Sequence, residues 1–312
     1  MKPTTFTELV GCARPLQLAG MGGIISDVGL SAAVTNAGGL GMLGGGGVPA
    51  PALRSMLEAL SEAAEGPFGV NFLMPFVSRD PVEVAARLSR VCDFHFGTPD
   101  PSYVELVHEG GALAGWQVGS PEEAIAAVEA GCDFIIAQGF EAGGHVRGTL
   151  PLDDLLARIV GAVDVPIVAS GGVGTAERVR DLMAAGAAGV RIGTRFVAAS
   201  ESPAHPDYVA ALLAASADDT ELTETFGADW PNAPHRVLRS SIQAATAATE
   251  EEIATVGLGA GAWPVHRFSS LPPTKDVHGN IAAMAQYAGT SVEHVTTRQP
   301  AAEIVAQLCA LL

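Results

Sequence analysis

The chain has 312 residues, of which 48% are hydrophobic and only 16% charged, so it can bury a large core and is not intrinsically disordered. Its 34 acidic residues outnumber 17 basic ones and aromatic residues make up only 5%, which argues against a protein that binds the phosphate backbone of nucleic acids. No apolar run is long enough to span a membrane, and the first ten residues lack the features of a signal peptide. We therefore expect a cytoplasmic protein that binds neither nucleic acid nor membrane.

The four cysteines are far apart in the sequence and form no C-x-x-C pair. This spacing argues against a zinc site and against a disulfide framework, so we expect no metal. Small buried hydrophobic residues are the simplest interpretation of Cys12, Cys92, Cys132 and Cys309.

Short β-rich segments alternate with Ala-, Leu- and Glu-rich segments through the first two thirds of the chain. Ser120 and Pro121 have the pattern of a helix N-cap and first turn, while Gly131 and Gly186 are typical of helix C-termini. The predicted strands are Pro15–Ala19, Leu40–Leu43, Phe68–Phe72, Val91–Phe96, Leu113–Val118, Phe134–Gln138, Pro166–Ala169 and Gly189–Ile192.

Eight β-α units in sequence predict an α/β fold, the (β/α)8 TIM barrel. A doubly wound open sheet is the main alternative, because the same alternation produces both architectures. The number of units favours the barrel. Glycines and polar residues also gather directly after the strands, where the loops of a barrel all open on the face that carries the active site.

The character of the chain changes after the eighth strand, where prolines and tryptophans interrupt Ala-rich stretches. We interpret residues 203–274 as a mostly helical C-terminal insertion or lid. Residues 1–202 and 275–312 then form the barrel, with Ile281–Tyr287 and Ala301–Leu312 as helices that close it.

Two glycine-containing loops are candidates for binding a phosphate. Gly171 and Gly172 follow the seventh predicted strand and open a helix, and Gly193 and Thr194 follow the eighth strand. Bare backbone N–H groups and a helix N-terminus favour anions, and the loops after strands 7 and 8 commonly hold phosphate in barrels. Simple tight turns are the alternative explanation.

Other strand ends indicate which molecule carries that phosphate. Met21 and Gly22 allow backbone to lie against a flat ring, and the amides of Asn71 and Gln138 can pair with the N–H and C=O edges of a ring. Amides together with a phosphate site predict flavin mononucleotide (FMN). Taken singly, each amide is equally explained as an ordinary buried side chain.

The loop after the sixth predicted strand is the most informative segment. It holds His145 between glycines, and an unperturbed histidine titrates near neutral pH, so we predict that His145 is a general base or acid. His95 also ends a strand and is the weaker candidate. His235 and Arg236 in the insertion either face the pocket or cap helices.

The sequence resembles the nitronate monooxygenase family, formerly 2-nitropropane dioxygenases, which are FMN-dependent TIM-barrel flavoenzymes. The resemblance lies in Ala19-Gly20-Met21, Asn36-Ala37-Gly38-Gly39-Leu40-Gly41, Phe68-Gly69-Val70-Asn71, Phe96-Gly97-Thr98-Pro99, the segment from Gln138 to His145, Ala169-Ser170-Gly171-Gly172, and Gly193-Thr194-Arg195-Phe196.

The resemblance implies an oxidoreductase in which a nitronate reduces FMN, O2 reoxidises it, and a carbonyl compound and nitrite result. By position, His145 would lie near the reactive edge of the flavin. The implied flavin contacts are Met21, Gly22, Asn71, Gln138, Gly143, Gly171, Gly172, Gly193 and Thr194. The implied partners are a nitronate or nitroalkane and O2, and a homodimer is compatible with the sequence.

Two other enzymes on the same barrel remain as alternatives, an FMN-dependent enoyl-acyl carrier protein reductase and an NAD(P)H:quinone reductase. Both take electrons from a nicotinamide, so rapid flavin reduction by NADH or NADPH distinguishes them from a nitronate monooxygenase. A flavin-binding protein without catalysis is the alternative from a different class.

Overall fold

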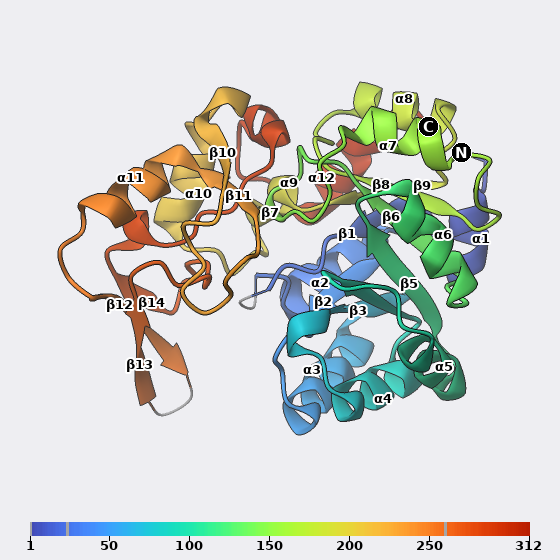
Figure 1. Cartoon of the computed structure of the whole chain (residues 1–312), viewed down its shortest axis with the longest axis horizontal. Helices are drawn as coiled ribbons and strands as arrows, with labels where there is room; N and C mark the ends of the chain where they lie inside the picture. Colours follow the sequence, from blue (N-terminus) through green and yellow to red (C-terminus); the bar gives the residue numbers. More distant parts are fainter. Residues whose placement is uncertain (1, 23–24, 259–260) are drawn as a thin grey trace.

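The computed structural model describes residues 2–22, 25–258 and 261–312. Eight parallel strands form one sheet in the order β1-β9-β8-β6-β5-β4-β3-β2, and a parallel bridge between Gln17 and Leu40 joins its two edges into a barrel (Figure 1). The predicted barrel is therefore confirmed, and the open sheet is wrong. The barrel strands are β1 (Leu16–Leu18), β2 (Gly41–Gly44), β3 (Phe68–Leu73), β4 (Val91–His95), β5 (Leu113–Val118), β6 (Phe134–Gln138), β8 (Ile167–Ser170) and β9 (Gly189–Ile192).

Helices cover the outside of the barrel and begin and end where the sequence indicates. The Ser120 side chain accepts a hydrogen bond from the Glu123 N–H at the start of α6. Gly131 and Gly186 lie at φ +94° and +107°, which allows the chain to turn after α6 and α8. The helices of the barrel are α2 (Val28–Asn36), α3 (Ala50–Ala63), α4 (Arg79–Leu88), α5 (Pro101–Gly110), α6 (Pro121–Glu129), α7 (Leu152–Ile159), α8 (Ala176–Ala184), α9 (Thr194–Val197) and α12 (Ala301–Leu308).

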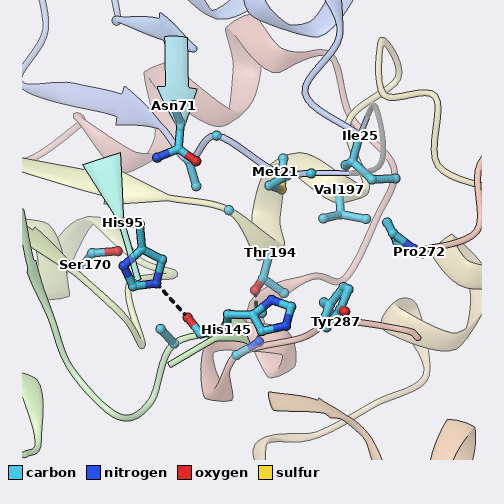
Figure 2. A pocket seen from close by; sticks show the side chains of 18 of the residues that line it. Met21, Ile25, Asn71, His95, His145, Ser170, Thr194, Val197, Pro272 and Tyr287 are labelled. Carbon is cyan, nitrogen blue, oxygen red and sulfur yellow. Dashed lines mark hydrogen bonds between the residues drawn. The ribbon is translucent and has the colours of Figure 1, made fainter. Parts of the chain in front are cut away.

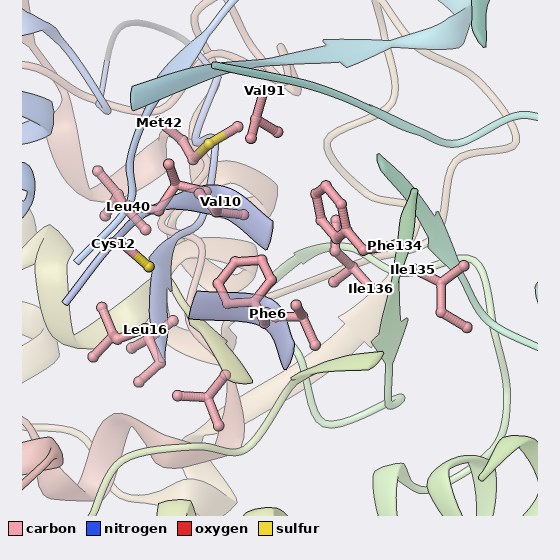
Figure 3. Packing of buried hydrophobic residues seen from close by; sticks show 14 of the residues in the cluster. Phe6, Val10, Cys12, Leu16, Leu40, Met42, Val91, Phe134, Ile135 and Ile136 are labelled. Carbon is pink, nitrogen blue, oxygen red and sulfur yellow. The ribbon is translucent and has the colours of Figure 1, made fainter. Parts of the chain in front are cut away.

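The N-terminal end of the barrel is closed by apolar side chains (Figure 3). Phe6 on α1 (Thr5–Val10) packs edge-on against Phe134 at the start of β6, with ring centroids 5.6 Å apart, and both rings are fully buried. A Cβ on Gly115 would lie 2.3 Å from the Phe134 ring, so the missing side chain makes room for it. This packing leaves the opposite end of the barrel for a functional site.

The inward-facing strand positions become polar toward the C-terminal end of the barrel. Successive side chains of a strand point to opposite faces, so Asp93 and His95 on β4 both face inward. Phe94 between them points outward, where it contacts Tyr103 of α5 with ring centroids 5.7 Å apart. Burying polar groups costs free energy unless they are paired, which indicates that this end of the barrel serves function rather than stability.

The region after β9 forms a smaller unit beside the barrel mouth, yellow to orange in Figure 1. It differs from the predicted mostly helical insertion, because much of its regular structure is strand. Two three-stranded sheets run in the orders β10-β11-β7 and β13-β12-β14. Its elements are α10 (Pro206–Leu213), β10 (Thr220–Thr223), β11 (His235–Leu238), α11 (Arg239–Ala247), β12 (Glu252–Leu258), β13 (Gly261–His266) and β14 (Val277–Gly279), with β7 (Gly144–His145) supplied by a barrel loop.

Strand β14 follows residue 274 in the chain and pairs with β12, with Val277 opposite Val256. The predicted helix Ile281–Tyr287 is wrong, since only the 3-10 turn Ile281–Ala283 forms. β-branched residues such as Thr255, Val256 and Val277 fit a pleated surface, and here they outweigh the alanine-rich composition on which the helical prediction was based. The division of the chain into barrel and insertion stays a prediction.

None of the helices in the described ranges combines the length and apolar character needed to cross a bilayer.

Candidate active site at the C-terminal mouth of the barrel

A cavity of about 310 Å³ opens at the C-terminal ends of the barrel strands, where the smaller unit covers it (Figure 2). This volume is in the range of small-molecule sites. All ten residues that the sequence predicts for the site line this cavity, although their roles in binding and catalysis stay predictions. They are Met21, Gly22, Asn71, Gln138, Gly143, His145, Gly171, Gly172, Gly193 and Thr194.

One side of the cavity is a backbone cradle built from the loops after β8 and β9. Gly171 and Gly172 lie at φ +104° and +66°, where other residues are strained, and a Cβ on Gly172 would lie 3.2 Å from the Glu141 Cβ. Among the described residues, the N–H groups of Gly172 and Thr194 have no hydrogen-bond acceptor. Unpaired N–H groups that line a cavity fit an anion such as a phosphate.

Gly143 has a structural explanation besides ligand binding. The backbone of Gly289 passes so close that a Cβ on Gly143 would lie 2.4 Å from the Gly289 nitrogen. The Gly289 N–H also donates a 3.0 Å hydrogen bond to the Thr194 hydroxyl. Gly143 therefore lets the segment at Gly289 approach the loop that carries His145.

The floor of the cavity is a buried polar network that the sequence analysis missed. Asp93 is fully buried and accepts hydrogen bonds from Gln17 Nε2 at 2.8 Å, Asn71 Nδ2 at 2.5 Å and Arg191 Nη1 at 2.7 Å. Asn71 and Asp93 are neighbours in the parallel register, as are Gln17 and Arg191. A charged residue in the middle of an apolar strand, such as Asp93 or Arg191, was the available signal.

A second group of polar side chains converges on the carbonyl oxygen of His145. Gln138 Nε2 donates to this oxygen at 3.0 Å, and His95 Nε2 lies 3.2 Å from it. Because a carbonyl only accepts, His95 carries its proton on Nε2, and burial lowers its pKa to about 3. Gln138 Oε1 and His95 Nδ1 are then buried acceptors without a donor among the described residues.

The imidazole of His145 lies in an aromatic enclosure. It stacks on Trp230 with ring centroids 3.9 Å apart and planes inclined by 25°, and Phe96, His235 and Tyr287 lie within 5.9 Å of it. Burial, reinforced by His235 and His95, lowers the pKa of His145 to about 3. The ring is therefore neutral at pH 7, and its buried Nε2 has no partner in the described part of the chain.

Phe76 and Trp230 line the outer wall of the cavity. Phe96 does not line it but packs against Trp230, and we define these three rings as the aromatic cluster. Trp230 comes from the smaller unit and meets the other two rings edge-on, each with centroids 4.9 Å apart. Phe96 has φ +63°, a rare conformation for a bulky residue and one that occurs preferentially at functional sites. No local sequence pattern indicates this cluster, because Trp230 is remote from the barrel loops in sequence.

His235 and Arg236 support the site from outside the cavity, which neither of them lines. His235 is fully buried, accepts from the Phe226 N–H at 3.1 Å and bonds the Ala233 carbonyl at 2.8 Å. Arg236 donates to the Phe140 carbonyl at 2.9 Å. Their strand, β11, pairs with β7 at His145, so they hold the His145 loop in place.

Comparison with known proteins identifies a matching family and several relatives of this chain. The family model for nitronate monooxygenase matches residues 4–88 and 76–310. A nitronate monooxygenase of Pseudomonas aeruginosa is 31% identical in an alignment 269 residues long that covers 71% of this chain and 76% of that protein. A relative from Rhodococcus jostii is 32% identical over 242 residues, which are 77% of this chain but only 66% of that relative. That relative is named (3aS,4S,5R,7aS)-5-hydroxy-7a-methyl-1-oxo-octahydro-1H-indene-4-carboxyl-CoA dehydrogenase.

Two solved structures match over nearly the whole chain. FabK from Thermotoga maritima superimposes with a TM-score of 0.80 at 26% identity, covering 99% of this chain and 95% of that one. A nitroalkane oxidase from Streptomyces ansochromogenes superimposes with a TM-score of 0.78 at 28% identity, covering 98% and 97%.

Proposed function

This chain belongs to the nitronate monooxygenase family and is an oxidoreductase, and from that premise we propose that it uses FMN and O2 to convert small alkyl nitronates into carbonyl compounds and nitrite. The observation that carries the proposal is the content of one cavity. This cavity combines the backbone cradle at Gly172 and Thr194 with the unpaired acceptors of Gln138 and His95. It also contains the neutral imidazole of His145, which stacks on Trp230 of the aromatic cluster.

The residues of the cavity fit FMN at both ends of that molecule. The unpaired N–H groups of Gly172 and Thr194 suit its phosphate. Gln138 Oε1 and His95 Nδ1 are acceptors without a donor among the described residues, which suits the one N–H on the pyrimidine edge of the oxidised ring. FMN would supply the electron transfer between nitronate and O2, and the protein would supply orientation and hydrogen bonds.

The neutral state of His145 favours a nitronate over its parent nitroalkane as the substrate. A nitroalkane must lose a proton, and a base whose conjugate acid has a pKa of about 3 accepts that proton poorly. A nitronate is already anionic and needs no base. The neutral imidazole can instead donate its N–H to a nitronate oxygen, so in this proposal His145 orients the anion.

The aromatic cluster supports a small substrate. Phe76 and Trp230 close the side of the cavity that faces the smaller unit, so FMN in the cavity would leave limited space for a substrate beside these rings. A short alkyl nitronate fits what remains better than a long acyl chain does.

A second candidate is reduction of an unsaturated or quinone substrate with NAD(P)H as the electron donor. It is favoured by the similarity to FabK over the full chain and by the relationship to a dehydrogenase that acts on a CoA thioester. It shares the barrel and the flavin with the first proposal and differs in the electron donor.

An anaerobic reduction experiment tests both proposals. The purified protein is saturated with FMN, and the visible absorbance band of the oxidised flavin is followed after adding ethylnitronate to one sample and NADH or NADPH to another. We expect bleaching with the nitronate alone. Bleaching only with the nicotinamide would assign the second candidate, and absence of any flavin binding would refute both.

A further inference from the structure

A buried ion pair at the floor of the cavity has no role in the function proposed above. Arg191 on β9 is 3% exposed, Asp93 on β4 is fully buried, and Arg191 Nη1 lies 2.7 Å from Asp93 Oδ2. Taking two charges out of water costs several kcal/mol for each ion, and apolar residues of similar volume are often at least as stabilising. Stability alone therefore gives no reason for this pair.

Arg191 has hydrogen-bonding capacity that the protein does not use. Its guanidinium carries five N–H donors, and only Nη1 finds an acceptor among the described residues. Arg191 also lines the cavity. The remaining donors and the positive charge are thus available to a molecule that fills the cavity.

Asp93 sets both the position and the effective charge of this group. It holds the guanidinium through Oδ2, and its own negative charge partly cancels that of Arg191. Through Oδ1 it accepts the amide N–H of Asn71, so the carbonyl oxygen of Asn71 is left for the cavity. One carboxylate therefore orients two of the groups that border a ligand.

The position of the pair indicates which part of FMN it meets. The phosphate cradle at Gly172 and Thr194 lies in the loops beyond the ends of β8 and β9. Arg191 lies within β9, and its partner Asp93 lies across the barrel on β4 beside Asn71. With the phosphate held at the rim, the ring of the same molecule would lie over the barrel interior, above this pair.

We propose that Arg191 and Asp93 set the reduction potential of the bound flavin, with Arg191 stabilising the negative charge of the reduced ring and Asp93 limiting that effect. Uptake of two electrons and one proton gives the ring one additional negative charge. In a cavity with a low dielectric constant this charge interacts strongly with a nearby cation. The inference rests on the FMN assignment made under the proposed function.

The test is a set of midpoint potentials for FMN bound to the wild type, D93N, R191Q and the double variant D93N/R191Q. D93N leaves Arg191 without its counter-charge, so the potential rises. R191Q leaves a buried carboxylate, so the potential falls. We expect each change to alter the relative affinity for reduced over oxidised FMN at least tenfold, which is about 30 mV for a two-electron couple.

The double variant keeps the test valid if R191Q does not fold, since removing one partner of a buried pair is strongly destabilising. Going from D93N to D93N/R191Q removes the arginine charge without leaving an unpaired carboxylate, and the potential should fall by the same tenfold factor. Shifts of equal sign in D93N and R191Q, or no fall between D93N and the double variant, would overturn the inference.

Binding of riboflavin, which lacks the phosphate, separates the inference from a phosphate contact. If Arg191 binds the phosphate, its loss in the D93N background weakens FMN but not riboflavin and leaves the potential unchanged, a result that refutes our proposal. A wild-type protein that binds no flavin refutes the proposed cofactor instead. Opposite potential shifts in a protein that does not oxidise nitronates would refute only the proposed substrate.

Discussion

The buried, neutral imidazole of His145 defines what this residue can do. Its N–H can orient an anion, but its low pKa makes it a poor acceptor of protons at neutral pH. The same burial that keeps the ring neutral strengthens any hydrogen bond that it makes to a charged group, because the surrounding dielectric constant is low.

We predict that His145→Ala retains FMN and lowers kcat/KM for ethylnitronate about 10-fold or more, the loss expected for one hydrogen bond to a charged group. Since the pKa of His145 is about 3, the group stays neutral above that value and contributes no inflection between pH 6 and 8. Steady-state kinetics across this range check both points. His278→Ala, at an exposed histidine on β14, is the matched control. A wild-type inflection near pH 6.5 that disappears in His145→Ala would contradict the neutral state.

The backbone cradle at Gly172 gives a second prediction. Gly172 and Gly161 both have positive φ, +66° and +81°, but Gly161 lies in an exposed turn away from the cavity. Alanine costs roughly 1–2 kcal/mol of stability at either position because of backbone strain. Only Gly172→Ala also distorts the cradle, because its Cβ would crowd the Glu141 Cβ at 3.2 Å, so we expect its Kd for FMN to rise about 10-fold. Fluorescence titration of both variants checks this, and an equal loss of FMN affinity in Gly161→Ala would show that the cradle is not the cause.

At the residue scale, the sequence revealed the groups that follow strands but not the groups beneath them. Asn71, Gln138 and His145 were found because polar residues and glycines after a predicted strand lie at the mouth of a barrel. Asp93 and Arg191 lie inside strands, where their partners depend on register and on which strands face each other across the barrel. Neither the register nor the facing strands can be read from a short stretch of one sequence.

At the scale of elements, repetition decided what could be predicted. Each β-α unit combines an apolar strand with a helix, and eight such units admit few architectures, so local patterns predict the barrel. The smaller unit has no repeat. Its strands pair across long loops, as β10 with β11 and β12 with β14, and its alanine-rich composition alone does not distinguish strand from helix.

The aromatic cluster combines Phe76 and Phe96 of the barrel with Trp230 of the smaller unit, and this leads to a prediction about substrate specificity. Trp230→Leu keeps an apolar side chain but removes the ring that stacks on His145 and contacts Phe76 and Phe96. We expect kcat/KM for a bulky aryl nitronate relative to ethylnitronate to rise about 10-fold, the scale on which pocket volume discriminates substrates. Competition assays with the two nitronates measure this ratio.

Trp263→Leu is the matched control for that experiment, because Trp263 on β13 is 60% exposed and does not line the cavity. It should leave the ratio unchanged. An unchanged ratio in Trp230→Leu would mean that the aromatic cluster does not limit the size of the substrate.

At the scale of the whole molecule, the site makes the fold sensitive to acid. Burial lowers the pKa values of His95 and His145 to about 3, from 6.5 when exposed, and His235 shifts in the same direction. Because the unfolded state binds these protons first, the stability that the neutral rings contribute is fully present above pH 6.5. It is lost as the pH falls from 6.5 toward 3.

We therefore predict that the free energy of unfolding falls by about 1.4 kcal/mol per pH unit for each of His95 and His145 between pH 6 and 5, where carboxylates contribute little. Urea unfolding at a fixed excess of FMN measures this slope, since constant ligand keeps the binding contribution comparable. His95→Gln removes one titrating ring and should reduce the slope by one proton. Equal stability at pH 6 and pH 5, or the wild-type slope in His95→Gln, would mean that the ring of His95 is charged or solvated in the folded protein. His95 Nδ1, which we propose as an acceptor for the N–H of the flavin ring, would then no longer be able to accept that hydrogen bond.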